Sequence, residues 1–166
     1  MASTQEKNNC LEGGISSRLR LNSMFIGEYS YSIDDKKRLA IPAKMRLSLG
    51  KKAVITRGLD NCLSLYPVKD WGKLVEKISK LPLSGADARG FARLMLTGAM
   101  EVNLDSLGRI LIPDFLKEYA SLKKKVVIAG VNDRLEIWDE NKWKEYKNKT
   151  ESSGKDIAER LKELGI

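Results

Sequence analysis

Apolar and polar residues alternate from Gly27 to Ile33, which is the period of a half-buried strand. The alternation resumes at Leu39 and Ile41 after a short polar turn. Pro42 then stops the strand, because it has no backbone N–H to donate, and it suits the first turn of a helix. This stretch therefore predicts a strand, a turn, a second strand and a short helix through residue 49.

Strand and helix periods continue to alternate along the chain, which indicates a mainly β protein with helices. Turn-forming residues from Gly58 to Asn61 and from Gly130 to Asp133 each join two strands into a hairpin. The further predicted strands cover residues 53–56, 62–66, 101–104, 126–129 and 135–138. The further predicted helices cover residues 67–81, 86–96 and 113–119, a segment from 143, and a short segment around 157–164.

Three of these helices carry apolar residues on one face. The sets are Trp71, Leu74, Val75, Ile78 and Leu81 in the first, Ala92, Met95 and Leu96 in the second, and Ile157, Leu161 and Leu164 in the last. We expect the first stripe to face the core or an interface and the second to point inward. The last helix is a candidate to dock on a neighbouring molecule.

A long-range repeat organises the whole pattern. The stretch from Ile33 to Pro42 recurs from Leu104 to Pro113, at an offset of 71 residues. Each copy has an apolar residue, an acidic turn, an arginine, three strand residues and a proline. At an offset of 72, Gly58, Leu63, Leu65, Tyr66 and Trp71 match Gly130, Leu135, Ile137, Trp138 and Trp143. The chain is a tandem duplication, and such units usually bury their apolar faces against one another.

The composition gives the chain a net positive charge and excludes several kinds of functional site. The 166 residues carry a net charge of +8, which favours a polyanionic partner because Lys and Arg displace the counterions of phosphates. Histidine is absent, so metal hydrolysis with His ligands is excluded. Cys10 and Cys62 form neither a zinc pattern nor a disulfide framework, which fits a reduced, cytoplasmic setting. No apolar run has the length of a membrane helix.

The repeated motif resembles the MraZ family. The residues that carry this resemblance are Met24 to Tyr29, then Asp34-Asp35-Lys36-Lys37-Arg38 with Ile41-Pro42, and in the second copy Gly108-Arg109 with Ile112-Pro113. Two correctly spaced copies are far more specific than one. The resemblance implies two tandem AbrB-like half-units that form a double-split, swapped-hairpin β-barrel with helices. It also implies a bacterial transcriptional regulator that forms rings and binds repeated promoter sites ahead of the division and cell-wall gene cluster.

On this basis we divide the chain into four parts. We expect residues 1–23 to be a flexible N-terminal extension, residues 24–83 the first unit, residues 84–150 the second unit, and residues 151–166 a helical tail. MraZ sequences normally begin at a position like Met24. The extension is therefore natural, the product of an upstream start codon, or added in cloning, and the sequence leaves these alternatives open.

Four residues are the candidate DNA contacts: Lys36, Lys37, Arg38 and Arg109. An arginine at the start of a hairpin strand can reach a phosphate or bind guanine with two hydrogen bonds. The first turn has three consecutive cations, so we expect the first unit to present the main DNA-facing hairpin. An alternative is that each arginine pairs with its turn aspartate, Asp34 or Asp105, and stabilises the turn.

Lys37 stands where the MraZ pattern usually has glycine, which serves positions with positive φ. Either the turn is of a type that tolerates lysine, or strain of about 1 kcal/mol is accepted there. The turn aspartates Asp34 and Asp35, with Asp105, are a weak candidate for a magnesium-dependent nuclease, since such residues commonly bond their own backbone.

We therefore expect a non-enzymatic regulator in the cytoplasm and nucleoid. It should bind double-stranded DNA at direct repeats, form a ring-like homo-oligomer, and need no cofactor, metal, membrane or small-molecule ligand. The rival hypothesis is an antitoxin-like or structural module of the same fold that binds a protein partner.

Overall fold

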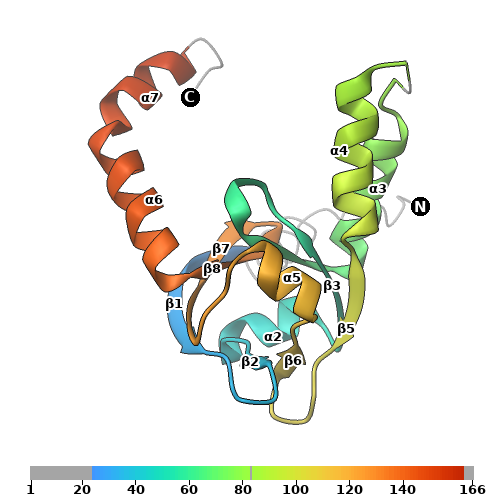
Figure 1. The fold of residues 1–166 in the computed structure, drawn as a ribbon, viewed down its shortest axis with the longest axis vertical. Helices are drawn as coiled ribbons and strands as arrows, with labels where there is room; N and C mark the ends of the chain where they lie inside the picture. The colour runs from blue at the N-terminus through green and yellow to red at the C-terminus, as the bar shows by residue number, and fades with distance from the viewer. Residues whose placement is uncertain (1–23, 83, 163–166) are drawn as a thin grey trace, which may run out of the picture.

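A computed structural model describes residues 24–82 and 84–162, which form an α+β fold with antiparallel strands (Figure 1). The strands are β1 (Phe25–Ser32), β2 (Arg38–Ala40), β3 (Lys52–Arg57), β4 (Leu63–Pro67), β5 (Met100–Asn103), β6 (Arg109–Leu111), β7 (Lys125–Asn132) and β8 (Arg134–Asp139). The helices are α2 (Ala43–Leu49), α3 (Val68–Ser79), α4 (Ala86–Thr97), α5 (Asp114–Tyr119), α6 (Glu140–Ser152) and α7 (Gly154–Leu161), and a 3-10 turn, η1, spans Leu59–Asn61. Predictions that fall on residues 1–23, on residue 83 or on residues 163–166 lie outside the described residues, and they include those on Cys10 and Leu164.

The two halves of the repeat exchange strands. Six strands form one sheet in the order β1-β7-β8-β4-β3-β5, and β2 pairs with β6 in a separate two-stranded sheet. β1 of the first half pairs with β7 of the second, and β5 of the second half pairs with β3 of the first. The hairpins β3-β4 and β7-β8 meet where β4 pairs with β8. The duplicated sequence therefore folds as one intertwined body.

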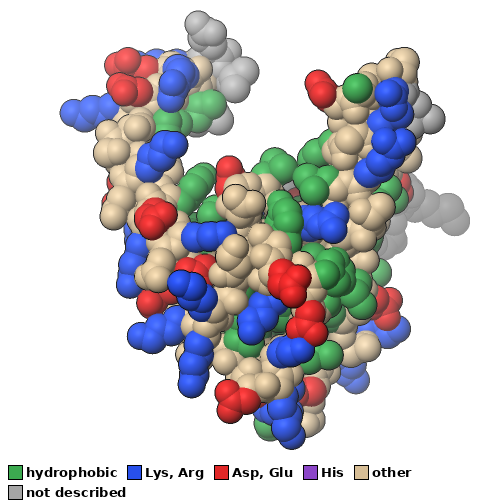
Figure 2. All heavy atoms as spheres, in the orientation of Figure 1, with side chains coloured by type: hydrophobic (Ala, Val, Ile, Leu, Met, Phe, Trp, Pro, Cys, Tyr) green, Lys and Arg blue, Asp and Glu red, His purple; other side chains and the backbone are tan. Residues whose placement is uncertain are grey.

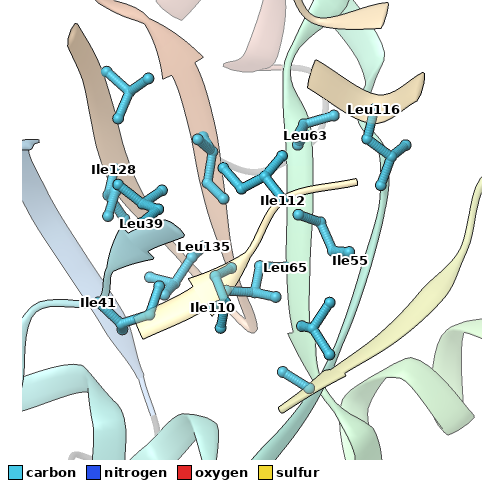
Figure 3. Close-up of a cluster of buried hydrophobic side chains, with 14 of the residues drawn as sticks. Leu39, Ile41, Ile55, Leu63, Leu65, Ile110, Ile112, Leu116, Ile128 and Leu135 are labelled. Carbon is cyan, nitrogen blue, oxygen red and sulfur yellow. The ribbon is translucent and has the colours of Figure 1, made fainter. Parts of the chain in front are cut away.

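Apolar residues of both sheets form a common core. Strand alternation points Leu39 of β2 and Ile110 of β6 inward, and Ile41 and Ile112 follow directly after these strands. Figure 3 shows these four side chains among buried residues of the larger sheet and of α5, namely Ile55, Leu63, Leu65, Leu116, Ile128 and Leu135. Full burial of each such side chain contributes about 1.5–3 kcal/mol to folding. The small β2-β6 sheet, which carries both repeated turns, is thereby fixed on the large one.

The predicted elements are confirmed with small shifts at their ends, except for one turn. The sequence predicts a turn from Gly130 to Asp133, but β7 continues through Asn132. The reason is that β7 pairs with β8 on one side and with β1 on the other. The pairing with β1 extends to Phe25, which lies opposite Asn132. Glycine at position 130 lets β1 approach closely, since an added Cβ would lie 2.4 Å from the backbone nitrogen of Ile26.

Two helical arms extend from the sheets on the side opposite to β2 and β6 (Figure 1). α3 packs against α4 in one arm, and α6 continues into α7 in the other. In the predicted stripe of α3, Ile78 is buried whereas Trp71, Leu74 and Val75 are only half-buried. The expectation that Leu96 points inward is wrong, because its side chain is 42% exposed.

Candidate nucleic-acid interface

The two copies of the repeated turn lie next to each other at one end of the molecule (Figure 1). Antiparallel pairing of β2 with β6 brings them together. Beyond the strands, the Ile41 N–H donates to the Gly108 carbonyl and the Ile112 N–H donates to the Lys37 carbonyl, both at 2.9 Å. This reciprocal pair of bonds holds each turn against the other, so the candidate residues of both halves share one surface.

The first turn is organised by the carboxylate of Asp34. Its Oδ1 accepts the backbone N–H groups of Lys36 at 2.9 Å and Arg38 at 2.8 Å, and its Oδ2 accepts the Arg38 Nε–H at 2.8 Å. These bonds, led by the one from the Arg38 backbone, hold the pKa of Asp34 below its ordinary value. The arginine therefore pairs with its turn aspartate.

The second turn repeats this arrangement. Asp105 Oδ1 accepts the N–H groups of Leu107 and Arg109 at 2.9 Å, and Oδ2 accepts the Arg109 Nε–H at 2.8 Å. The pKa of Asp105 is also lowered, chiefly by the Arg109 side chain. Nε and Nη2 of Arg109 both contact Asp105, whereas Nη1 lies 3.8 Å from Oδ2 of Asp34, so Arg109 joins the two turns. The alternative of arginine–aspartate pairing is confirmed in both copies.

Lys37 occupies the left-handed position of the first turn. Its φ is 60°, close to the 72° of Gly108 at the equivalent place, so lysine has not changed the type of turn. A non-glycine residue in this region costs about 1–2 kcal/mol. The Lys37 Nζ lies 2.7 Å from Oδ2 of Asp114 in α5, and this exposed ion pair connects the first turn to the second half of the repeat.

Gly108 meets a requirement of space as well as of φ. A Cβ at this position would lie 2.2 Å from Nε of Arg46. Arg46 belongs to α2 of the first half, and its Nε–H donates to the Ile41 carbonyl at 2.8 Å. The second turn therefore rests on an arginine of the first half.

The four candidate residues differ in what they can still bind. Lys36 is exposed, and no acceptor among residues 24–82 and 84–162 holds its ammonium group. Within that part of the chain, the side chain of Arg38 is bonded through Nε only, which leaves its two terminal nitrogens for a further acceptor. Lys37 and Arg109 are both committed to carboxylates. Figure 2 accordingly shows acidic and basic side chains together at this end of the molecule.

Comparison with known proteins identifies the repeat. The family described as "MraZ protein, putative antitoxin-like" matches residues 24–94 and again residues 95–164. The chain belongs to the MraZ family. Relatives named "Transcriptional regulator MraZ" come from Natranaerobius thermophilus, Moorella thermoacetica and Clostridium tetani, with 50%, 49% and 48% identity respectively. Each match covers 143 residues, 86% of this chain and 100% of the relative.

The MraZ resemblance of the repeated motif is thus confirmed, and with it a function in transcription regulation rather than in catalysis. The described residues contain no group of three His, Cys, Asp or Glu side chains that could hold a metal. Of the weak nuclease candidates Asp34, Asp35 and Asp105, the first and the last are instead bonded to their arginines. No helix within the described part of the chain is long and apolar enough to cross a membrane.

Some residues next to the MraZ turns were not among the sequence candidates. Arg46 and Asp114 support the turns from the neighbouring helices, and no sequence signal connects them to residues so far away. The Lys124 carbonyl accepts the Ile33 N–H at 2.8 Å, and the Lys51 carbonyl accepts the Leu104 N–H at 2.9 Å. Lysine pairs therefore flank both turns, at residues 51–52 and 123–124. Their spacing of 72 residues was a usable signal.

Proposed function

We propose that this MraZ family regulator binds double-stranded DNA with the end of the molecule that carries both turns. The observation behind this proposal is the β2-β6 pairing, which gathers Lys36, Lys37, Arg38 and Arg109 on one surface. Positive charge on one surface of a protein is the electrostatic footprint of a nucleic-acid partner. A cytoplasmic, nucleoid-associated location follows from this function.

The four residues take different roles in this proposal. Lys36 neutralises a phosphate, because its ammonium group is exposed and unoccupied within the described chain. The terminal nitrogens of Arg38 bind a phosphate or the O6 and N7 atoms of guanine. Arg109 contributes less, because it already bonds Asp105 and approaches Asp34. Lys37 reaches DNA only by exchanging Asp114 for a phosphate.

The scaffold of this surface fits the double-split, swapped-hairpin β-barrel that the family resemblance implies. β1 adjoins β2 through the bridge between Ile33 and Leu39, and β5 contacts β6. The small sheet thus spans the two edges of the large one, and we propose that this closes the barrel. A closed barrel would hold both turns rigidly, which reduces the entropy lost on binding.

We further propose that identical subunits form a ring that binds direct repeats in promoters of the division and cell-wall genes, including its own promoter. The arms offer apolar side chains for contacts between subunits, with Val68, Leu96 and Tyr146 more than 40% exposed. A ring presents many turns at once, so weak single contacts add up across repeated sites.

Gel-shift titration with DNA upstream of the protein's own gene tests the proposal. Arg38→Ala should weaken binding by about 1–3 kcal/mol if it removes a base contact, and each lost phosphate contact should reduce the salt slope by about 0.9. The triple change of Lys36, Lys37 and Arg38 to Ala should have the largest effect, and Arg109→Ala a smaller one. A matched control changes three exposed lysines of the α3 arm, Lys69, Lys77 and Lys80, to Ala.

Equal losses in the two triple variants would mean that only overall charge matters. A stronger effect of Arg109→Ala than of Arg38→Ala would assign the main contact to the second turn. If the unmodified protein fails to bind this DNA, the antitoxin-like alternative named in the family description is favoured. A protein partner would then be sought with the same surface variants.

A further inference from the structure

The second turn exposes a leucine at its tip. Leu107 is 61% exposed, and its place in the repeat corresponds to Lys36 in the first turn. Leu111, which lies opposite Arg38 across the small sheet, is also 57% exposed. The first half of the repeat therefore gives this end of the molecule mainly cations, whereas the second half gives it large apolar side chains.

Leu107 is held in this position by the turn. Its backbone N–H donates to Asp105 Oδ1 at 2.9 Å, and the next residue, Gly108, bonds Ile41 and rests on Arg46. The backbone that carries the leucine is therefore held by hydrogen bonds at Leu107 itself and at the next residue. Such a preorganised apolar group loses little backbone entropy when it is buried against a partner.

The chemistry of the neighbouring residues indicates the partner. Cations at this end favour phosphates and guanine, and an apolar side chain in a major groove has one matching group, the C5 methyl of thymine. We propose, on the basis of the DNA-binding function above, that Leu107 is a specificity-determining residue that contacts thymine methyl groups. Each subunit then binds an asymmetric site, with cationic contacts from the first turn and an A·T pair read by the second.

The test compares two forms of one DNA fragment, the region upstream of the protein's own gene, amplified with either dTTP or dUTP. Uracil keeps the pairing with adenine but lacks the methyl group. Affinities are measured by fluorescence anisotropy at one fixed salt concentration. The unmodified protein should bind the uracil form about fourfold more weakly for each thymine contacted, the effect expected from losing one buried methyl-sized group.

Two variants assign this effect to the leucine. Leu107→Ala should bind both forms of the DNA equally. Leu107→Lys, which makes the second turn resemble the first, should also lose the preference and should increase the salt slope by about 0.9. The matched control is Leu59→Ala, because Leu59 has 59% exposure in η1, between the two arms and far from the turns (Figure 1). It should keep the full preference for thymine.

The outcomes separate this inference from the proposed function. Binding to DNA without a thymine preference, or a preference that Leu107→Ala retains, would overturn the role of Leu107 and leave DNA binding intact. A change of oligomeric mass in Leu107→Ala, with the preference unchanged, would assign the leucine to a subunit contact instead. Absence of binding to either form would overturn the proposed function itself.

Discussion

Asp34 and Asp105 determine the conformation of the two turns with one carboxylate each. Both accept two backbone N–H groups and an arginine Nε–H, so their charged forms are stabilised in the folded protein. We predict that NMR titration of the carboxyl carbons gives midpoints below the ordinary aspartate value for both residues. Because the pKa is lowered on folding, this contribution is fully present above the ordinary value and is lost as the pH falls through the lowered one. Midpoints at the ordinary value would show that these bonds do not persist in solution.

The left-handed positions of the turns should respond differently to substitution. Gly108→Ala introduces strain at φ 72° and displaces Arg46, so we expect the free energy of unfolding to fall by more than about 1 kcal/mol. Lys37→Gly removes strain of similar size but also removes the exposed ion pair with Asp114, which contributes about 0–1 kcal/mol. Its net change should stay within about 1 kcal/mol. Urea denaturation measures both. A loss in Gly108→Ala no larger than that in Lys37→Gly would show that neither the positive φ of residue 108 nor its contact with Arg46 opposes an added Cβ.

At the scale of elements, the sequence predicts most of the strands and helices, because the same pattern occurs in both copies of the repeat. Hydrophobic periods and prolines locate the strands and helices around both turns. The periods do not tell which strand pairs with which, so the exchange of β1 and β5 between halves depends on the resemblance. The prediction that the turn begins at Gly130 was wrong for this reason. Glycine is needed there because the neighbouring strand β1 passes close to its backbone. The sequence predicts the cations of the candidate site. It does not predict the supporting contacts of Arg46 and Asp114, because these contacts join residues far apart in sequence.

Gly130 allows a direct test of the β1-β7 pairing. Strand propensity alone predicts that Gly130→Ala stabilises the protein by roughly 0.5–1 kcal/mol. The structure predicts the opposite, because the new Cβ would lie 2.4 Å from the backbone of Ile26 and would push β1 away. The matched control is Gly72→Ala in α3, where nothing lies within 4 Å of an added Cβ. The control should gain about 1 kcal/mol from helix propensity, and urea denaturation of both variants decides between propensity and packing.

At the scale of the whole molecule, the turns and the helical arms lie at opposite ends (Figure 1). Under the proposed function, this arrangement would let one end bind DNA while the other contacts neighbouring subunits. Contacts between different surfaces of identical chains either close into a ring or continue as a filament. Light scattering at micromolar concentration should give the mass of a closed oligomer. A monomer at this concentration would remove the ring, and with it the avidity on which specific binding depends.

In the proposed ring, DNA binding would depend on the number and spacing of sites. The first turn of one subunit offers three cations, so a single site should bind weakly, within the non-specific range of about 10⁻⁴–10⁻⁶ M at physiological salt. Two or three direct repeats should bind about 10²–10⁴ times more tightly, because the later contacts form within one assembly. Inserting about 5 bp between repeats turns the second site to the far side of the duplex and should abolish most of this gain. Titration of one-, two- and three-repeat duplexes and of the insertion at fixed salt measures these effects. Equal affinity for all four duplexes would show that each site is bound independently, whether or not the subunits form a ring.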